Sequence, residues 1–579
     1  MAHSLYPTMI SQILLPVAGT LLCYALFHVC QVLYHELTSP LRCVAGPRSP
    51  NFITGNFKEV ANDPDRTSKW RSEFGPIFRF KSLFSISELH ALDIKAISHI
   101  LTHNTIYQKA PFGLANTKRS LGNGMLIEAA LLPSLRSLGI ISVELDEHKR
   151  QRKILNPAFG VPQIRLLTET FIEKAVQLRE VWAPMAHNAA RIDVLVWLRR
   201  VTLDIIGQAA FNYDFDALQT NGKPNELNEV FTQLFHSPHS QRQQGFRLAQ
   251  AMVPILRLVV STPRPGARSE LIIDNVAHVQ PFPGQRLFAQ VRAKMFSIGN
   301  EILARSKADI RASEDQKKLS STKDLLSILL KANLSPDVPE GQRLSDAEVV
   351  AQIPTFFIAG HETTSTAVSW ALHALSLNSA AQRKLREELF TISTENPTMD
   401  ELNSLPYLES VVRETMRVHS PIVFTQRMAM QDDVLPLSKP YADKHGKSHD
   451  SLIIPKGQIM HIPILAVNTD KGIWGEDATE FRPERWEDIP QATSQIPSVW
   501  ANLLTFLAGP HNCIGFRFSL VEIKALLFIL LRAFEFEPAE PKGGIRPSAT
   551  LLQRPTVVAE PEKGSSLPLI VKRYDADRL

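Results

Sequence analysis

One cysteine stands apart in this sequence because of the residues around it. Cys513, in the stretch FLAGPHNCIGFRF, is the only cysteine between residues 44 and 579, which excludes a disulfide framework or a zinc site made of several cysteines. Three roles remain open: an inert buried thiol, a nucleophile, or a single thiolate ligand to a metal. Gly509 and Gly515 let the backbone turn tightly and approach a ligand closely. An apolar helix should follow, and the free N–H groups at its N-terminus favour a metal-binding thiolate.

A second group of polar residues, AGHETT at 359–364, lies inside a long apolar segment. A capping box of Ser345 and Glu348 starts a predicted helix that continues to about Leu377. Because this helix is apolar nearly all round, we expect it to be buried through the middle of the fold. Pro354 is expected to kink it.

The acid Glu362 and the hydroxyls of Thr363 and Thr364 occupy the middle of this helix. Such groups are costly in a buried place unless they have partners or a chemical task. For Thr363 the structural alternative is a hydroxyl bonded to the backbone of its own helix.

Three charged residues are spaced so that they could form one network. Glu414 and Arg417 are three positions apart on a predicted helix, so they share a face and can pair. Arg485, in FRPERW, could supply a second guanidinium to Glu414. A glutamate–arginine pair at this spacing is usually a surface pair, so the spacing alone assigns no function.

The body of the chain is predicted to be mostly helical, with short strands. PIFRFKSLF near residue 76 alternates as a strand does, and SLIIPKGQIMHIPI, with two apolar runs around a Pro-Lys-Gly turn, predicts a hairpin. With 44% hydrophobic and 21% charged residues, the composition is that of a globular protein. A net charge of +5 over 579 residues is too mild for a nucleic-acid-binding protein. We expect residues 58–579 to form one domain.

The N-terminus departs from this average. No Asp, Glu, Lys or Arg interrupts Ile10–Tyr34, and the length suits a bilayer crossing. A cleaved signal peptide is the alternative, but its apolar region would be shorter and a basic residue would precede it. The first basic residues, Arg42 and Arg48, follow the span, which predicts a body on the cytosolic side. We therefore expect a membrane anchor over residues 1–36 and a proline-rich linker over 37–57.

These pieces, in this order, resemble the cytochrome P-450 family of haem-thiolate monooxygenases. Four residues meet the family's signature Phe-x-x-Gly-x-x-x-Cys-x-Gly: Phe506, Gly509, Cys513 and Gly515. Glu414 and Arg417 meet Glu-x-x-Arg, residues 483–486 meet Pro-Glu-Arg-aromatic, and residues 359–364 meet Ala-Gly-x-Glu-Thr-Thr. The resemblance covers nearly the whole chain. It implies a mainly α fold with small β-sheets and a long central helix over the haem, plus one N-terminal transmembrane helix.

The resemblance also assigns roles to the polar groups. Cys513 would be the axial thiolate on the iron of haem b, where its electron donation favours O–O cleavage. Gly360 would open the central helix beside dioxygen, and Glu362 and Thr363 would relay protons with support from Thr364. A buried charged network near the haem would comprise Glu414, Arg417 and Arg485.

The haem propionates need cations, and the resemblance places four basic side chains near them: Arg427, Arg152, His148 and His511. Histidine replaces the family's usual tryptophan at position 148 and its frequent arginine at position 511. Lys149, Arg150 and Lys153 form either a solvated helix face or the surface that receives the electron donor.

An apolar substrate pocket is expected beside the haem, lined by Phe356, Phe357, Ile422, Val423 and Phe424. The resemblance implies insertion of one oxygen atom from O2 into a lipid, terpenoid or other secondary metabolite, as in microsomal enzymes of fungi. Electrons would come from NADPH through a separate cytochrome P-450 reductase, with cytochrome b5 as an optional second partner, at the endoplasmic reticulum membrane. Two alternatives stay open: an isomerase that needs no reductase, and a haem-binding sensor or carrier without turnover.

Two segments, 128–142 and 268–288, are surplus to the family's pattern. The first is largely apolar, with Arg136 as the one charge between Glu128 and Glu144, and it directly precedes the basic helix that begins near Glu144. A surface insertion would cost little chain entropy, but surface loops should be polar. We therefore expect a sequence artefact such as a translated intron, and a native protein that lacks most of residues 129–142.

Overall fold

The structure is a computed structural model. It describes residues 36–110 apart from 64, 65, 83 and 84, scattered positions from 16 to 34, and residues 139–219, 285–315, 324–548 and 552–575. Much of the predicted anchor, the glycine-rich turn at 121–126 and most of both surplus segments lie outside these residues. Within the described part of the chain, no helix combines the length and the apolar character needed to cross a membrane.

Helices dominate the described chain, and the sheets are small, which confirms the predicted mainly α fold. The longer helices are α6 (Leu145–Leu155), α7 (Val161–Met185), α8 (Val194–Phe211), α13 (Gln285–Asp315), α14 (Leu325–Leu334), α15 (Asp346–Leu377), α16 (Ser379–Leu389), α18 (Pro406–Val418) and α21 (Phe516–Ala533). The shorter ones are α2 (Phe57–Asn62), α3 (Arg66–Phe74), α4 (Ile94–Thr102), α17 (Met399–Asn403), α19 (Ile464–Asn468) and α20 (Lys471–Trp474).

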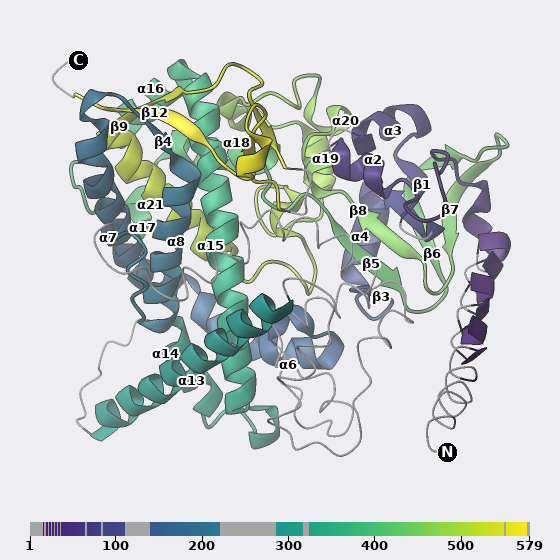
Figure 1. Cartoon of the computed structure of the whole chain (residues 1–579), viewed down its shortest axis with the longest axis horizontal. Helices are drawn as coiled ribbons and strands as arrows, with labels where there is room; N and C mark the ends of the chain where they lie inside the picture. Colours follow the sequence, from purple (N-terminus) through teal and green to yellow (C-terminus); the bar gives the residue numbers. More distant parts are fainter. Residues whose placement is uncertain are drawn as a thin grey trace, which may run out of the picture.

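The long central helix predicted from the sequence is α15. Its capping box is present, because the Ser345 hydroxyl accepts from the Glu348 N–H at 3.3 Å while the Glu348 carboxylate accepts from the Ser345 N–H at 2.7 Å. The helix runs on for 32 residues, through Pro354. Figure 1 shows α15 crossing the helical half of the molecule, with α7, α8 and α21 on one side of it and the largest sheet across the molecule on the other side.

The core of the helical half is built around α21. This helix is apolar nearly all round, and every residue from Leu520 to Leu531 is buried. Phe518 packs edge-on against Phe171 of α7, with 4.7 Å between ring centroids. A helix buried on all sides is held by packing rather than by propensity, so its first turn is a rigid support for the loop before it.

The strands form four small sheets. The largest has the order β1 (Ile77–Lys81), β2 (Ser87–Ala91), β8 (Ile459–Ile462), β5 (Thr425–Ala429), β3 (Tyr107–Gln108). A second contains β4 (Ala190–Asp193), β12 (Pro568–Arg573) and β9 (Phe534–Pro538). The two-stranded pairs are β6 (Asp433–Ala442) with β7 (Ser448–Ile454), and β10 (Ile545–Pro547) with β11 (Pro555–Val557).

The predicted strand near residue 76 is confirmed as β1, but the hairpin predicted around the Pro-Lys-Gly turn is wrong. β7 and β8 flank that turn without pairing with each other: β7 pairs with β6, whereas β8 pairs with β2 and β5. All four residues of β8 are buried, so this strand needs a neighbour on each side in the interior of a sheet. The turn alone does not show which neighbours it finds.

Residues 139–143, the end of the first surplus segment, pack against α15. The Ile140 N–H donates to the Gln352 side chain at 2.9 Å, and Ile140 is buried. The junction to α6 is strained, because Leu145 has a φ of 52°, which disfavours residues other than glycine. That the native protein lacks most of residues 129–142 stays a prediction.

Candidate active site

Backbone hydrogen bonds hold the loop that carries Cys513. The Cys513 N–H donates to the Phe506 carbonyl oxygen at 2.9 Å, and the Asn512 N–H donates to the Gly509 carbonyl oxygen at 3.2 Å. Gly509 has a φ of +70°, and a Cβ on it would lie 2.2 Å from the Leu101 carbonyl oxygen. Only glycine meets both conditions, so this turn depends on Gly509.

The thiol of Cys513 lies two residues before Gly515, the cap of α21, and the residue keeps exposed surface. Burial raises the pKa of the thiol, while the Gly515 N–H and the Arg152 guanidinium lower it by less. The predicted preference of the helix N-terminus for a thiolate is therefore present in the Gly515 N–H, while desolvation of the thiol opposes it. A coordinated metal cation would favour the thiolate further.

Phe159 connects the cysteine loop with the first half of α15. Its ring lies 3.8 Å from the position that a Cβ on Gly515 would take. The same ring packs edge-on against Phe356 of α15, with 5.5 Å between centroids. The cysteine loop and α15 therefore share one aromatic neighbour.

One face of the otherwise buried helix α15 is accessible, at residues 358, 359, 360 and 363, while residues 361 and 362 are buried. Ala359 is exposed and Thr363 is half-buried, whereas the helix is buried on both sides of these residues. The Thr363 hydroxyl donates to the Ala359 carbonyl oxygen at 2.6 Å, which is the structural alternative that the sequence left open. This bond places the hydroxyl on the accessible face of the helix.

Gly360 lies at the contact between α15 and α8. A Cβ on Gly360 would come within 2.8 Å of Cδ1 of Ile206. The missing side chain thus lets the two helices approach each other. The predicted role of Gly360 beside dioxygen is a separate matter and stays a prediction.

Glu362 is buried among basic side chains. Its carboxylate contacts Nε of Arg554 at 2.9 Å, Nε of Arg199 at 3.6 Å and Nε2 of His361 at 3.5 Å. Burial alone would raise the pKa of Glu362, but Arg199 and Arg554 hold it well below its usual range. The acid predicted to move protons is therefore ionised at neutral pH, with Arg199 reaching it from α8 and Arg554 from the segment before β11.

Thr364, the predicted supporting hydroxyl, is buried on another face of α15. It interacts with the carboxyl of Glu522 of α21, although neither oxygen of Glu522 has a well-formed hydrogen bond among the described residues. Burial raises the pKa of Glu522 well above its usual range, which favours the protonated form. Thr364 and Glu522 join the oxygen-side helix to the helix that follows Cys513.

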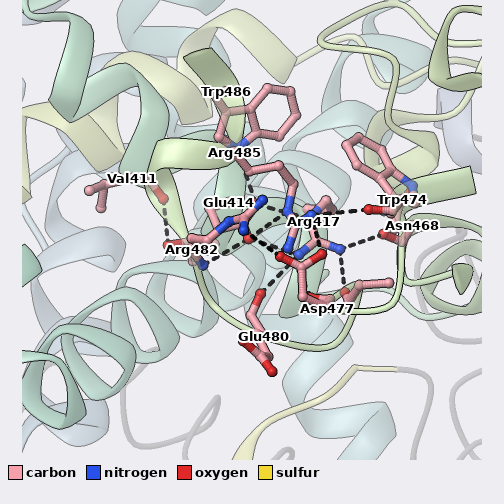
Figure 2. Close-up of polar contacts among 12 residues, drawn as sticks. Val411, Glu414, Arg417, Asn468, Trp474, Asp477, Glu480, Arg482, Arg485 and Trp486 are labelled. Carbon is pink, nitrogen blue, oxygen red and sulfur yellow. Dashed lines mark hydrogen bonds and ion pairs between the residues drawn. The ribbon is translucent and has the colours of Figure 1, made fainter. Parts of the chain in front are cut away.

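The structure brings Glu414, Arg417 and Arg485 together in one network, shown in Figure 2. The Arg417 guanidinium donates to both oxygens of Glu414, at 2.8 and 2.9 Å, and neither side chain has exposed surface. Arg485 donates to Glu414 from the other side at 3.4 Å, and the Trp486 indole adds a bond at 3.1 Å. Arg417 also donates to three backbone carbonyl oxygens, those of Asn468, Ala478 and Glu480.

The basic residues predicted to hold propionates meet near the start of α6. The rings of His148 and His511 lie 4.0 Å apart, and Arg152 donates to the carbonyl oxygen of Asn512 at 2.6 Å. Arg427 is buried on β5 and donates to the carbonyl oxygen of Gln426 at 2.8 Å. Burial lowers the pKa of His148 to about 3 and also lowers the pKa of His511. Both histidines are therefore neutral at pH 7 and can only donate as neutral imidazoles.

The residues predicted to line the substrate pocket do not share one environment. Ile422, Val423 and Phe424 are half-buried. Phe357 has no exposed surface, because its ring packs against Phe211 and Phe215, with centroids 4.6 and 5.1 Å away. Its assignment to the pocket stays a prediction. Phe356 is also largely buried, because its ring packs against the rings of Phe159 and Phe211. It points about 100° away from Phe357 around the helix.

Comparison with known proteins decides the family. The family model for cytochrome P-450 matches residues 45–561. This chain belongs to the cytochrome P-450 family. It is 46% identical over 549 residues to cytochrome P-450 monooxygenase 205 of Postia placenta, covering 93% of this chain and 94% of that protein. It is 43% identical over 566 residues to monooxygenase 128 of the same fungus, covering 96% and 97%.

A third relative is the ganoderic acid synthetase of Ganoderma lucidum, 32% identical over 547 residues, which covers 92% of this chain and 93% of that protein. The family consists of haem-thiolate oxidoreductases in which a cysteine thiolate binds the haem iron. This cytochrome P-450 is therefore a monooxygenase, and haem is its cofactor.

The residues of this cytochrome P-450 fit a haem. Cys513 offers an accessible sulfur at the end of a rigid turn. Arg152 and Arg427 provide permanent positive charge, and Nε2 of His511 is a buried polar atom without a well-formed hydrogen bond among the described residues. Arginines and an under-bonded imidazole are suitable partners for propionate carboxylates.

Sequence reasoning missed several charged residues of this site: Lys109, Glu144, Arg199, Glu522 and Arg554. Each belongs to no recognised motif and lies far along the chain from its partner. The one signal available was burial, because a charge inside an apolar segment, such as Glu522 in FSLVEIKALLF, must find a partner or lose its proton.

Proposed function

We propose that this cytochrome P-450 inserts one oxygen atom from O2 into an apolar organic substrate, with electrons from NADPH delivered by a separate reductase. The observation that carries the proposal is the accessible Cys513 thiol on its glycine turn. Haem b, bound through Cys513, supplies the oxygen activation. Helix α15 supplies polar side chains for the reaction, the accessible Thr363 and the buried Glu362.

Glu362 and Thr363 deliver protons in this proposal. The Thr363 hydroxyl is available on the accessible face of α15 once it releases the Ala359 carbonyl oxygen. Glu362 is ionised, so it can accept a proton from solvent only as its contacts with Arg199 and Arg554 loosen. The 3.6 Å contact with Arg199 is already long for an ion pair, which supports such movement.

Arg152, Arg427, His148 and His511 hold the haem propionates in this proposal. The two arginines contribute charge, and the two histidines contribute neutral N–H donors. Arg152 is already held by the amide of Asn512, the residue next to Cys513, so it links the propionate side to the thiolate side.

We propose an apolar substrate of the lipid, terpenoid or secondary-metabolite class. Ile422, Val423 and Phe424 carry apolar surface that is only half-buried. The relative named a ganoderic acid synthetase supports a natural-product substrate. A screen of purified protein for substrate-induced shifts of the haem spectrum would narrow the class.

Anchoring at the endoplasmic reticulum by residues 1–36, with the body in the cytosol, is part of the proposal and rests on the apolar N-terminal segment. Lys149 and Lys153 are exposed on α6 and suit an acidic electron donor such as the reductase or cytochrome b5. Arg150 is excluded from this surface role, because it is held by Glu147 and Glu348.

The deciding experiment is NADPH-dependent oxygen consumption by the purified protein with reductase added. The proposal predicts oxygen uptake that rises with a turned-over substrate. Substrate conversion without NADPH would indicate an isomerase, and haem binding without either reaction would indicate a sensor or carrier. Cys513→Ser should abolish the thiolate-type spectrum of the reduced carbon monoxide complex, and an unchanged spectrum would remove Cys513 from the mechanism.

The surplus segment has its own test. We propose that the native protein lacks most of residues 129–142, because the segment is apolar and joins α6 through the strained Leu145. Peptide mass spectrometry of the natural protein decides this. Detection of the peptide SLGIISVELDEHK would contradict the proposal.

A further inference from the structure

A carboxylate of the protein lies among the side chains that we assign to the haem propionates. Oε2 of Glu144 is 3.0 Å from Nε2 of His511, and Oε1 is 3.5 Å from Nζ of Lys109. Arg427 is close enough to act on the same carboxylate electrostatically. The Glu144 side chain is only 10% exposed, so solvent screens these interactions little.

Glu144 is held by charge rather than by directed bonds. Among the described residues, neither of its carboxylate oxygens has a well-aligned hydrogen-bond donor, and the contact with His511 is poorly aligned despite its length. Glu144 precedes α6, yet its side chain makes no capping bond to the helix in the described structure. A buried carboxylate that caps nothing is not explained by local structure.

The charges around Glu144 form a simple balance. Lys109 and Arg427 act on Glu144 as cations, and Arg152 adds a third positive side chain beside His148. Glu144 offsets one of these three positive charges, which leaves two for the two carboxylates of a haem. Glu144 and a propionate are therefore like charges that share the same cations, which disfavours both together.

We propose that Glu144 is a positioning residue that competes with a haem propionate for Lys109, His511 and Arg427, and so limits how tightly this enzyme holds haem. This inference rests on the proposed roles of Arg427 and His511. A purely structural role predicts the opposite sign, because a glutamate that merely braces Lys109 and His511 would loosen the haem when removed.

The test is the rate of haem transfer from the purified full-length ferric enzyme to excess apomyoglobin at pH 7.5. Glu144→Gln keeps the shape and removes the charge, and we expect haem loss about tenfold slower, equivalent to about 1.4 kcal/mol. We also expect a more positive ferric/ferrous potential, because a negative charge near the haem is gone. Faster or unchanged haem loss in this variant would overturn the inference.

Asp146→Asn is the matched control, because it removes the same charge from an exposed side chain two residues away. It should leave the rate of haem loss unchanged. An equal effect of Asp146→Asn and Glu144→Gln would mean that net charge, and not the position of Glu144, sets the rate, which also overturns the inference.

Two further variants keep the test decisive. Lys109→Gln should speed haem loss and should reduce the benefit of Glu144→Gln in the double variant, since the two groups interact directly. If the effects of Lys109→Gln and Glu144→Gln on the rate of haem loss add fully in the double variant, the inference is overturned even if one single variant folds poorly. Arg427→Gln distinguishes the role of Glu144 from the assignment of the propionate partners. If Arg427→Gln leaves the rate of haem loss unchanged, the assignment of the propionate partners fails. If Arg427→Gln speeds haem loss but Glu144→Gln does not slow it, only the proposed role of Glu144 fails.

Discussion

Glu414 and Glu362 are both buried glutamates with two arginine neighbours, yet their surroundings differ. Both oxygens of Glu414 accept bonds of 2.8 and 2.9 Å from Arg417, and further donors come from Arg485 and Trp486. Glu362 has one close arginine contact, at 2.9 Å, and looser contacts of 3.5 and 3.6 Å with His361 and Arg199.

The difference separates a fixed network from a movable one. A fully bonded buried network specifies one geometry, because moving any member leaves a buried charge unpaired. In the Glu362 cluster, Nε and Nη2 of Arg199 have no well-formed hydrogen bond within the described part of the chain. That cluster also adjoins the accessible face of α15. We infer that Glu414 supports the fold and that Glu362 serves the reaction.

Breaking the fixed network should have the largest effect. Arg417→Ala removes the two shortest bonds to the buried Glu414 and leaves three buried carbonyl oxygens without this donor, and we expect the free energy of unfolding to fall by about 3–5 kcal/mol. Urea denaturation of the purified protein, or loss of soluble haem-loaded protein, measures this. Arg413→Ala on the same helix is the control, because Arg413 pairs with Glu409 on a partly exposed face and should cost less than about 1 kcal/mol. Equal losses in both variants would remove the distinction.

Changing the movable cluster should affect turnover more than folding. Glu362→Gln removes the ionised acid, and we expect product formation to fall on the order of a hundredfold while haem content stays near the wild-type level. Product formation with saturating reductase and the spectrum of the reduced carbon monoxide complex measure the two quantities. A variant that loses haem and activity together would place Glu362 with Glu414 as a structural residue.

Acid pH should act at two half-buried histidines. His373 follows Glu362 on α15, and His419 follows Arg417 after α18; Trp370 stacks on His419 with 4.6 Å between centroids. Burial lowers the pKa of His373 to about 4 and the pKa of His419 to about 3. Both values lie below the ordinary 6.5, so on acidification the unfolded chain binds protons first.

Stability should therefore fall as the pH drops from about 6.5 toward 4. We expect His373 alone to account for about 2 kcal/mol between pH 8 and pH 5. Urea denaturation at the two pH values tests this, with His373→Gln as the variant. An undiminished pH dependence in that variant would show that His373 is protonated in the folded protein without cost.

The smallest effect should come from Thr363→Ala. Among the described residues the hydroxyl bonds within its own helix, so stability should hardly change. NADPH consumption should continue, while product per NADPH falls several-fold because electrons are diverted to peroxide and water. Peroxide and product assayed in the same reaction measure the split. Wild-type product per NADPH would show that Thr363 has no essential part in proton delivery.

The sequence by itself determined the features that depend on neighbouring residues. The capping box fixed the start of α15, the glycines marked the turn around Cys513, and the three-residue spacing paired Glu414 with Arg417. Turns, caps and helix faces follow from local backbone sterics and periodicity, which the order of residues contains.

Only the tertiary structure decided which distant groups meet. Arg199 and Arg554 reach Glu362 from α8 and from the C-terminal region, and Lys109 reaches Glu144 from beside β3. The structure also pairs β7 with β6 and β8 with β2 and β5, and it buries Phe357 in the core. These outcomes depend on how buried faces pack across the molecule. The pKa of Cys513 also depends on this packing, because desolvation of the thiol raises the pKa more than the helix N-terminus lowers it. No local sequence pattern reveals that desolvation.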